Sequence, residues 1–114
     1  MTFMDVLKLA IAVATIGFGM ISIVSPKSAE KFTGLQATGP RGISEIRAVL
    51  GGLFVGLGAA ALIYQTPPAY GTLGIGYLGI AVIRVGSIYF DKASTPSNWS
   101  SLAFEVAFGV LLLI

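Results

Sequence analysis

Four apolar segments, separated by short polar breaks, form the main pattern of hydrophobic and polar positions along the chain. They cover about residues 4–24, 43–64, 70–90 and 98–114. Each segment is close to the roughly 20 apolar residues that a helix needs to cross a bilayer. The breaks hold turn and helix-start signals, at Pro26, Gly39-Pro40, Pro67-Pro68 and Pro96. The pattern predicts an all-α polytopic membrane protein, in which residues 1–114 form one domain of four transmembrane helices in an antiparallel bundle.

The second segment combines a stripe of small residues with two charges in its first turn. At helical spacing the small residues share one face: Ala48, Gly52, Gly56 and Ala60. Such a stripe lets the backbone of another helix approach closely. Glu45 lies on the face of the stripe, whereas Arg47 lies about 200° further round the helix, at roughly 100° per residue. We therefore predict that this helix is packed on at least two sides.

The third and fourth segments each have a polar face that contains one buried charge. Arg84 shares a face with Tyr77, Ser87 and Asp91, and Glu105 follows Asn98 and Ser101 on the fourth segment. At about 1.5 Å per residue, Arg84 and Glu105 both lie roughly 10 Å inside the same membrane boundary. The spacing predicts an ion pair between Arg84 and Glu105 across the hairpin, with Glu45 as the next nearest carboxylate.

Four charges in the predicted spans, Glu45, Arg47, Arg84 and Glu105, fall in one half of the bilayer, and their signs cancel. A neutral network is expected, because an unpaired buried charge costs several kcal/mol. The candidate site consists of these four residues and one hydroxyl: Glu45, Arg47, Arg84, Ser87 and Glu105. Two interpretations stay open, a structural charge network and a ligand-binding cluster. For Arg47, snorkelling toward lipid phosphates is a further alternative.

The composition agrees with a membrane protein and excludes several kinds of chemistry. Hydrophobic residues make up 55% of the chain and charged residues 11%, where soluble domains have about a quarter charged. The chain has no Cys and no His, which removes disulfides, thiol catalysis, iron–sulfur ligation and the usual haem ligand. No carboxylate pair has the spacing of metal ligands, so neither a metal nor a cofactor is predicted.

Two function classes have little support in the sequence. The net charge is only +2 and no basic run with interleaved aromatic residues occurs, so nucleic-acid binding is not expected. An intramembrane enzyme would need a nucleophile and a base. The candidate nucleophiles Ser44, Ser87 and Ser101 have no His, Cys or clear Lys partner. The protein is therefore expected not to be an enzyme, and no catalytic residue is predicted.

The charged loops indicate an orientation in the membrane. The 25–42 and 91–97 loops fall on one side and hold four basic residues, Lys27, Lys31, Arg41 and Lys92. The other side holds only Lys8. The positive-inside rule places the charged loops in the cytoplasm. Both termini are therefore predicted to be extracytoplasmic.

The charged and glycine positions together resemble a known family. They read Glu45-x-Arg47-Ala48-x-x-Gly51-Gly52-x-Phe54-x-Gly56-x-Gly58, then Arg84-x-x-Ser87 with Asp91, then Glu105. This pattern is similar to that of small bacterial four-span proteins classed as domain of unknown function 4345. The resemblance covers the last three segments, about two thirds of the chain. It implies a four-helix membrane bundle in the bacterial cytoplasmic membrane, and no activity.

Two interpretations of function remain. In the first, the protein is a non-catalytic accessory or scaffold subunit of a larger membrane complex, and its small-residue faces dock other membrane subunits or a second copy of the chain. In the second, it binds or transports a small molecule such as a lipid or quinone. That function would use the cluster of Arg47, Arg84, Glu45 and Glu105.

Overall fold

The computed structural model describes residues 1–114, and every regular element in it is helical. The elements are α1 (Phe3–Val24), α2 (Pro26–Thr33), α3 (Pro40–Glu45), the π-helix η1 (Ile46–Leu53), α4 (Phe54–Tyr64), α5 (Pro67–Phe90) and α6 (Pro96–Leu113). Elements α3, η1 and α4 follow one another without a break and form one long helix, Pro40–Tyr64. The all-α prediction is confirmed.

The helix ends follow local signals in the sequence. The side chain of Thr2 caps α1 and forms a reciprocal capping box with Asp5. Thr66 and Thr95 accept hydrogen bonds from backbone N–H groups in the first turns of α5 and α6, which both begin with proline. Gly34 ends α2 with a φ of 80°, a conformation that glycine adopts without steric cost. These caps fix where the long helices begin.

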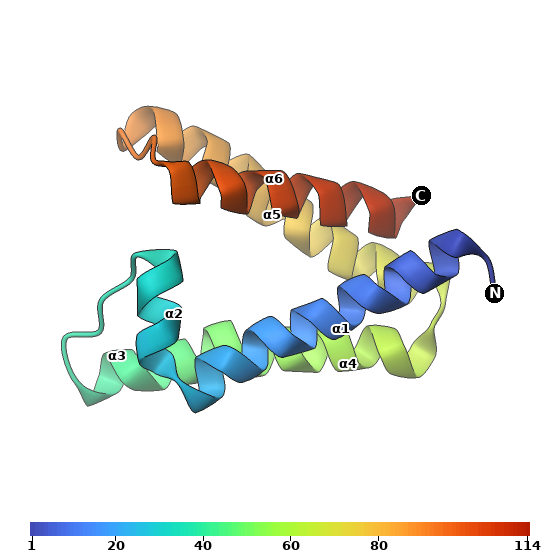
Figure 1. Cartoon of the computed structure of the whole chain (residues 1–114), viewed down its shortest axis with the longest axis horizontal. Coiled ribbons are helices and arrows are strands. Elements are labelled where there is room, and N and C mark those ends of the chain that lie inside the picture. Colours follow the sequence, from blue (N-terminus) through green and yellow to red (C-terminus); the bar gives the residue numbers. More distant parts are fainter.

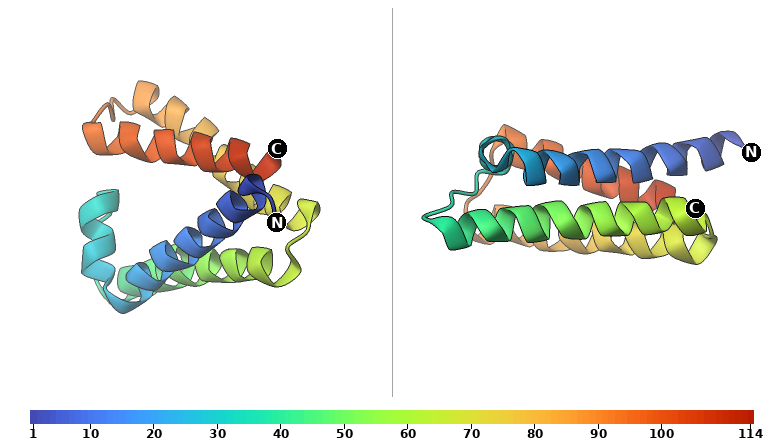
Figure 2. Two further views of the ribbon diagram at one scale, coloured as in Figure 1. Left: turned by 45° about the vertical axis from the view of Figure 1, so that its right-hand side comes forward. Right: turned by 90° about the horizontal axis from the view of Figure 1, so that it is seen from below.

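The helices form two antiparallel hairpins that spread apart as a V (Figure 1). Helix α1 packs along η1 and α4, and α5 packs along α6; the same pairing is visible in both views of Figure 2. The hairpins meet at the end that holds both termini, and α2 lies at the open end (Figures 1 and 2). The helices of each hairpin run antiparallel, and the bundle of four transmembrane helices stays a prediction.

Contact between the hairpins is concentrated near the closed end of the V. A small cluster of buried apolar side chains joins them there: Ile11, Ala12, Ala61, Tyr70, Leu73 and Leu112. Next to it, the hydroxyl of Tyr77 on α5 shares a hydrogen bond with the hydroxyl of Thr15 on α1. Since each hairpin makes most of its contacts within itself, the open end of the V is left without a common core.

Within each hairpin the closest contact is a pair of facing glycines. A Cβ placed on Gly19 would lie 2.6 Å from the carbonyl oxygen of Gly51, and one on Gly51 would lie 3.1 Å from that of Gly19. The second hairpin repeats this arrangement with Gly74 and Gly109, at 2.9 and 3.1 Å. At 2.6 and 2.9 Å a side-chain carbon would force the backbones apart, and at 3.1 Å the neighbour would have to move by a few tenths of an ångström. The glycines therefore set the spacing of both helix pairs.

The predicted packing stripe is not the face that the chain uses for its own contacts. Ala48, Gly52 and Gly56 are exposed and Ala60 is half-buried, while Gly51 and Gly58 are buried against α1. Gly51 and Gly58 are seven residues apart and share a face that lies about 100° round the helix from the stripe, at roughly 100° per residue. The stripe has no partner helix within the chain, so its packing against another helix stays a prediction.

Three helices are long and apolar enough to cross a membrane: Phe3–Val24, Pro40–Tyr64 and Pro67–Phe90. Only 19 of the 114 residues are buried, so most of the apolar side chains cover the outside of the molecule, as in a membrane protein. Helix α6 is shorter and starts with a polar turn that contains Ser97 and Asn98. The fourth span therefore stays a prediction.

We expect Gly74→Ala to destabilise the second hairpin, because the added methyl group would meet the carbonyl oxygen of Gly109. Overpacking of this kind costs about 1–3 kcal/mol. Gly76→Ala in the same helix is the matched control, since a Cβ there meets nothing within 4 Å. Because alanine has a higher helix propensity than glycine, Gly76→Ala should leave the stability unchanged or raise it. Unfolding of the purified variants in detergent measures both effects, and equal stability of the two variants would contradict the glycine contact.

Candidate functional site

Arg84 on α5 and Glu105 on α6 form a two-pronged ion pair. The Nε of Arg84 donates to Oε1 of Glu105 at 2.8 Å, and one terminal nitrogen donates to Oε2 at 2.7 Å. Glu105 is buried, with 8% of its surface exposed, while the side chain of Arg84 is 30% exposed. Paired geometry of this kind is among the strongest that charged side chains make. The predicted partnership of Arg84 and Glu105 is confirmed.

Asn98 is the third member of this cluster. It lies on the predicted polar face of the fourth segment but was not among the predicted site residues. Its side-chain oxygen accepts a hydrogen bond of 2.7 Å from the other terminal nitrogen of Arg84. Its side-chain nitrogen donates to the carbonyl oxygen of Ala93 in the turn before α6. The seven-residue spacing of Asn98 and Glu105 puts both on one helix face, and this was the available signal. Asn98 thereby ties Arg84 to the α5–α6 turn.

Glu45 and Arg47 do not join this cluster. Glu45 is paired with Arg41, and both side chains are exposed. The long helix begins at Pro40, earlier than the predicted residue 43, so Arg41 lies one turn before Glu45 on the same helix. Arg47 donates to the carbonyl oxygen of Ile23, in the last turn of α1, where carbonyl groups lack partners within the helix. The single network of four charges does not form within the chain.

Ser87 lies beside the cluster but not within it. Its hydroxyl donates to the carboxylate of Asp91 at 2.6 Å, one turn further along α5. Together with Arg84 and Asn98 it lines a hollow of about 520 Å³ on the flank of α5, whose other lining residues are Gly79, Ile80 and Ile83. This volume falls within the range of small-molecule sites, about 300–1,000 Å³. The structure therefore brings three polar side chains and two isoleucines to one hollow.

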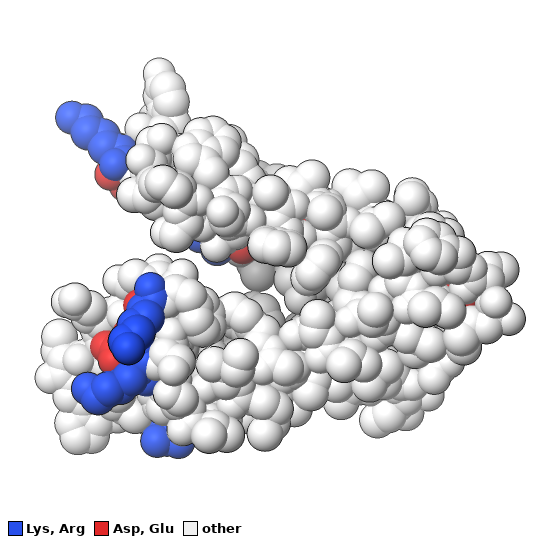
Figure 3. Space-filling view, viewed as in Figure 1, with Lys and Arg blue, Asp and Glu red and all other residues white.

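The charged pair faces the space between the hairpins. Arg84 lies seven residues after Tyr77, which contacts α1, so the two side chains project from the same side of α5. In Figure 3, blue and red atoms lie together on the side of the α5–α6 hairpin that faces the other arm. Apart from Asp91 and Lys92 at the turn, Arg84 and Glu105 are the charged residues of that hairpin. They therefore account for this patch.

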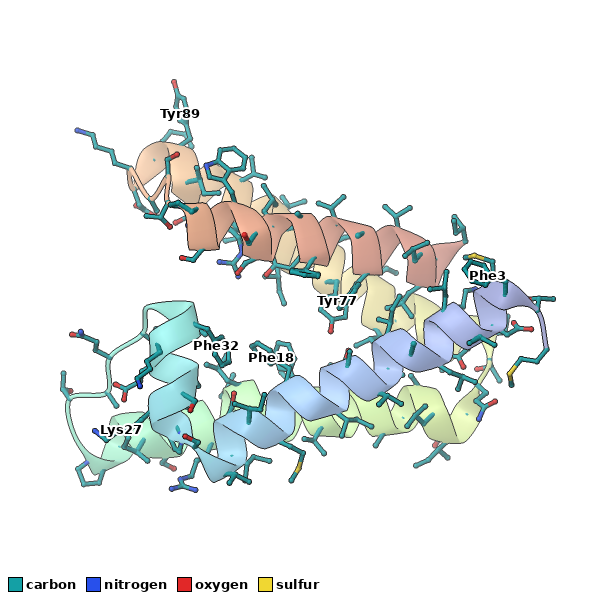
Figure 4. The ribbon with its side chains drawn as sticks, in the orientation of Figure 1. Phe3, Phe18, Lys27, Phe32, Tyr77 and Tyr89 are labelled. Carbon is teal, nitrogen blue, oxygen red and sulfur yellow. The ribbon has the colours of Figure 1, made fainter.

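Aromatic side chains face the same space from the first hairpin. Figure 4 shows Phe18 on α1 pointing toward the α5–α6 hairpin, Phe32 on α2 pointing toward Phe18, and Tyr77 pointing toward α1. The ring centroids of Phe18 and Phe32 are 5.0 Å apart, and Phe54 of α4 lies 5.1 Å from Phe18. These distances are typical of favourable aromatic pairs. The open V thus has a polar wall and an aromatic wall.

The predicted family is the one that the comparisons find. A family model described as "Domain of unknown function (DUF4345)" matches residues 3–114. The chain belongs to this family. The match also includes the first segment, which the sequence resemblance left out. No curated protein and no solved structure matches the chain. The family description assigns no activity, so function has to be argued from the geometry.

The Arg84–Glu105 pair generates a prediction for a double-mutant cycle. Arg84→Leu or Glu105→Leu alone should lower the free energy of unfolding by roughly 1–4 kcal/mol, because the remaining charge is left unpaired in a poorly hydrated place. The double variant should lose less than the sum of the two losses. Unfolding in detergent gives the coupling energy. Strictly additive losses would show that the two groups do not interact.

A second charged pair provides the control for this cycle. Arg41 and Glu45 lie one turn apart on α3, at the start of the long helix, and both side chains are exposed in the chain alone. Exposed pairs contribute little to stability, since water and salt screen them. The same cycle with Arg41→Leu and Glu45→Leu should give no measurable coupling.

Proposed function

We propose that the protein is a small non-catalytic subunit of a larger membrane assembly, made with other membrane proteins or with further copies of the chain. The observation that carries this proposal is the exposed small-residue stripe on the long Pro40–Tyr64 helix, defined by Ala48, Gly52 and Gly56. A Cβ on Gly56 would meet nothing within 4 Å, so this face has no partner in the chain. Stripes of this kind are where helices in membranes approach each other most closely.

A second small-residue face of the same helix strengthens the argument. Gly51 and Gly58 already pack against α1, where added Cβ atoms would lie within 3.1 Å of the backbone. The chain therefore shows what a small-residue face on this helix does when a partner is present. Association without new polar contacts suits a helix whose outer surface is apolar, because close van der Waals packing is then the main gain.

The membrane arrangement is part of the proposal. In it, α6 is the fourth span, and all four helices cross the bacterial cytoplasmic membrane. Figure 3 shows the Lys and Arg atoms gathered at the open end of the V, where α2, α3 and the α5–α6 turn lie. The positive-inside rule supports a cytoplasmic position for this end, and an extracytoplasmic one for both termini.

Crosslinking in native membranes tests the subunit role. The chain has no cysteine, so single cysteines can be introduced without background. We expect Gly56→Cys to form one defined adduct, either with a second copy or with one partner protein. Ile75→Cys, which is 63% exposed on α5, is the matched control, because Ile75 lies as far from the start of α5 at Pro67 as Gly56 lies from the end of α4 at Tyr64. It should form no adduct.

The same cysteine variants can also contradict the subunit role. If both cysteines react fully with a membrane-permeant maleimide and neither forms an adduct, the stripe faces lipid and the subunit role fails.

Reporter fusions test the orientation. A fusion after Ile114 should be active with a reporter that works only outside the cytoplasm. A fusion in the loop between Gly34 and Gly39 should be active with a cytoplasmic reporter, since this loop lies at the other end of the molecule. Cytoplasmic activity of the fusion at Ile114 would reverse the proposed orientation.

A further inference from the structure

We propose that the hollow beside Arg84 binds a neutral lipophilic molecule through a carbonyl oxygen, with a quinone head group as the carrier of that oxygen. The binding groups are the guanidinium of Arg84 and the amide of Asn98, and the hollow has a volume of about 520 Å³. This site is distinct from the outward stripe to which the subunit role is assigned. The experiments on the hollow therefore test this proposal independently of the subunit role.

The polar wall offers donors and few free acceptors. Arg84 has five N–H groups, and three are used by Glu105 and Asn98. Both oxygens of Glu105 and the side-chain oxygen of Asn98 already accept from Arg84. Two guanidinium N–H groups and one amide N–H of Asn98 remain without a partner in the chain. The chemistry that matches unused donors is an acceptor oxygen.

The charge balance selects a neutral acceptor over an anion. The positive charge of Arg84 is already neutralised by Glu105 at 2.7 Å, and Ser87 on the rim of the hollow is bonded to the carboxylate of Asp91. A ligand carboxylate or phosphate would bring a further negative charge close to Glu105, which is unfavourable where water is scarce. A carbonyl oxygen accepts the same hydrogen bonds without that repulsion.

The apolar surroundings select a lipophilic body with a flat head group. Ile80 and Ile83 line the hollow, and both are exposed in the chain alone. Phe18 and Phe32 of the first hairpin do not line this hollow but face the space of the V, and Phe32 remains 38% exposed (Figure 4). Aromatic side chains favour a planar partner through stacking or edge contacts. An ester carbonyl of a glycerolipid offers the same acceptor without a ring.

Binding measurements on the full chain in nanodiscs test the site. Ubiquinone-1 and dioleoylglycerol are the two probes, and empty nanodiscs correct for partition into lipid. Quenching of the single tryptophan, Trp99, next to Asn98, reports binding, together with a ligand-dependent rise in the unfolding temperature. We expect saturable binding of ubiquinone-1. Saturable binding of dioleoylglycerol instead, with the same dependence on the variants below, would name the lipid ester as the source of the carbonyl.

Two kinds of variant show whether the named residues bind the probe. Arg84→Leu combined with Glu105→Leu removes the donors without leaving a charge unpaired, and should weaken binding at least about tenfold, as loss of hydrogen bonds from a charged group does. Phe32→Leu keeps the charged pair and should weaken binding of ubiquinone-1 by about two- to tenfold through loss of an aromatic contact. Phe90→Leu is the control, because Phe90 is 81% exposed and should not affect binding.

Three results would overturn the proposal. The first is that neither probe binds saturably to the wild-type chain. The second is that none of the variants changes binding. In that case Phe32→Leu and Phe90→Leu bind ubiquinone-1 with the affinity of the wild type, and the double leucine variant binds both probes with unchanged affinity. The third is stronger stabilisation by oleate than by either neutral probe, since an anion site would then be present.

Discussion

The close approach of two helix backbones at facing glycines is the contact on which both hairpins depend. The facing glycines are Gly19 and Gly51 in the first hairpin and Gly74 and Gly109 in the second. A Cβ on any of them would lie 3.1 Å or less from the carbonyl oxygen of its partner glycine. Helices with apolar outer surfaces gain little from burying more apolar surface in a lipid environment, so tight packing has to supply the stabilisation. The second crossing also places Arg84 and Glu105 at one level, four to ten residues from these glycines along the two helices.

The charged pair connects this packing to the chemistry of the open V. Because Arg84 reaches across to Glu105, both oxygens of the buried carboxylate are satisfied, and no buried polar side-chain atom in the chain lacks a partner. The remaining donors of Arg84 lie beside a hollow with two isoleucines. Arg84 thus neutralises the charge of Glu105 and still has N–H groups free to donate to an acceptor on a ligand. Its structural and binding roles do not exclude each other.

The two proposals use different surfaces of the molecule. The subunit role rests on the outer face of the long helix at Gly52 and Gly56, and the binding role rests on the inner wall of the V at Arg84 and Asn98. The V itself follows from a small contact between the hairpins, near Thr15 and Tyr77 at the closed end. A partner subunit at the outer face would leave the inner space accessible to a small lipophilic molecule.

The sequence by itself determined the helical class, the hairpin turns at the prolines, and the partnership of Arg84 with Glu105, because all of these follow from local periodicity and from depth along a helix. Tertiary structure decided the rest. Within the chain the long helix packs through the face of Gly51 and Gly58 and not through that of Gly52 and Gly56, because the position of α1 decides which face is covered. Because the helix starts at Pro40, Arg41 lies one turn before Glu45 and forms an ion pair with it. Arg47 donates instead to a backbone carbonyl oxygen at the end of α1. The open V could not be read from the sequence, since the contacts that join or separate two hairpins depend on residues far apart in the chain.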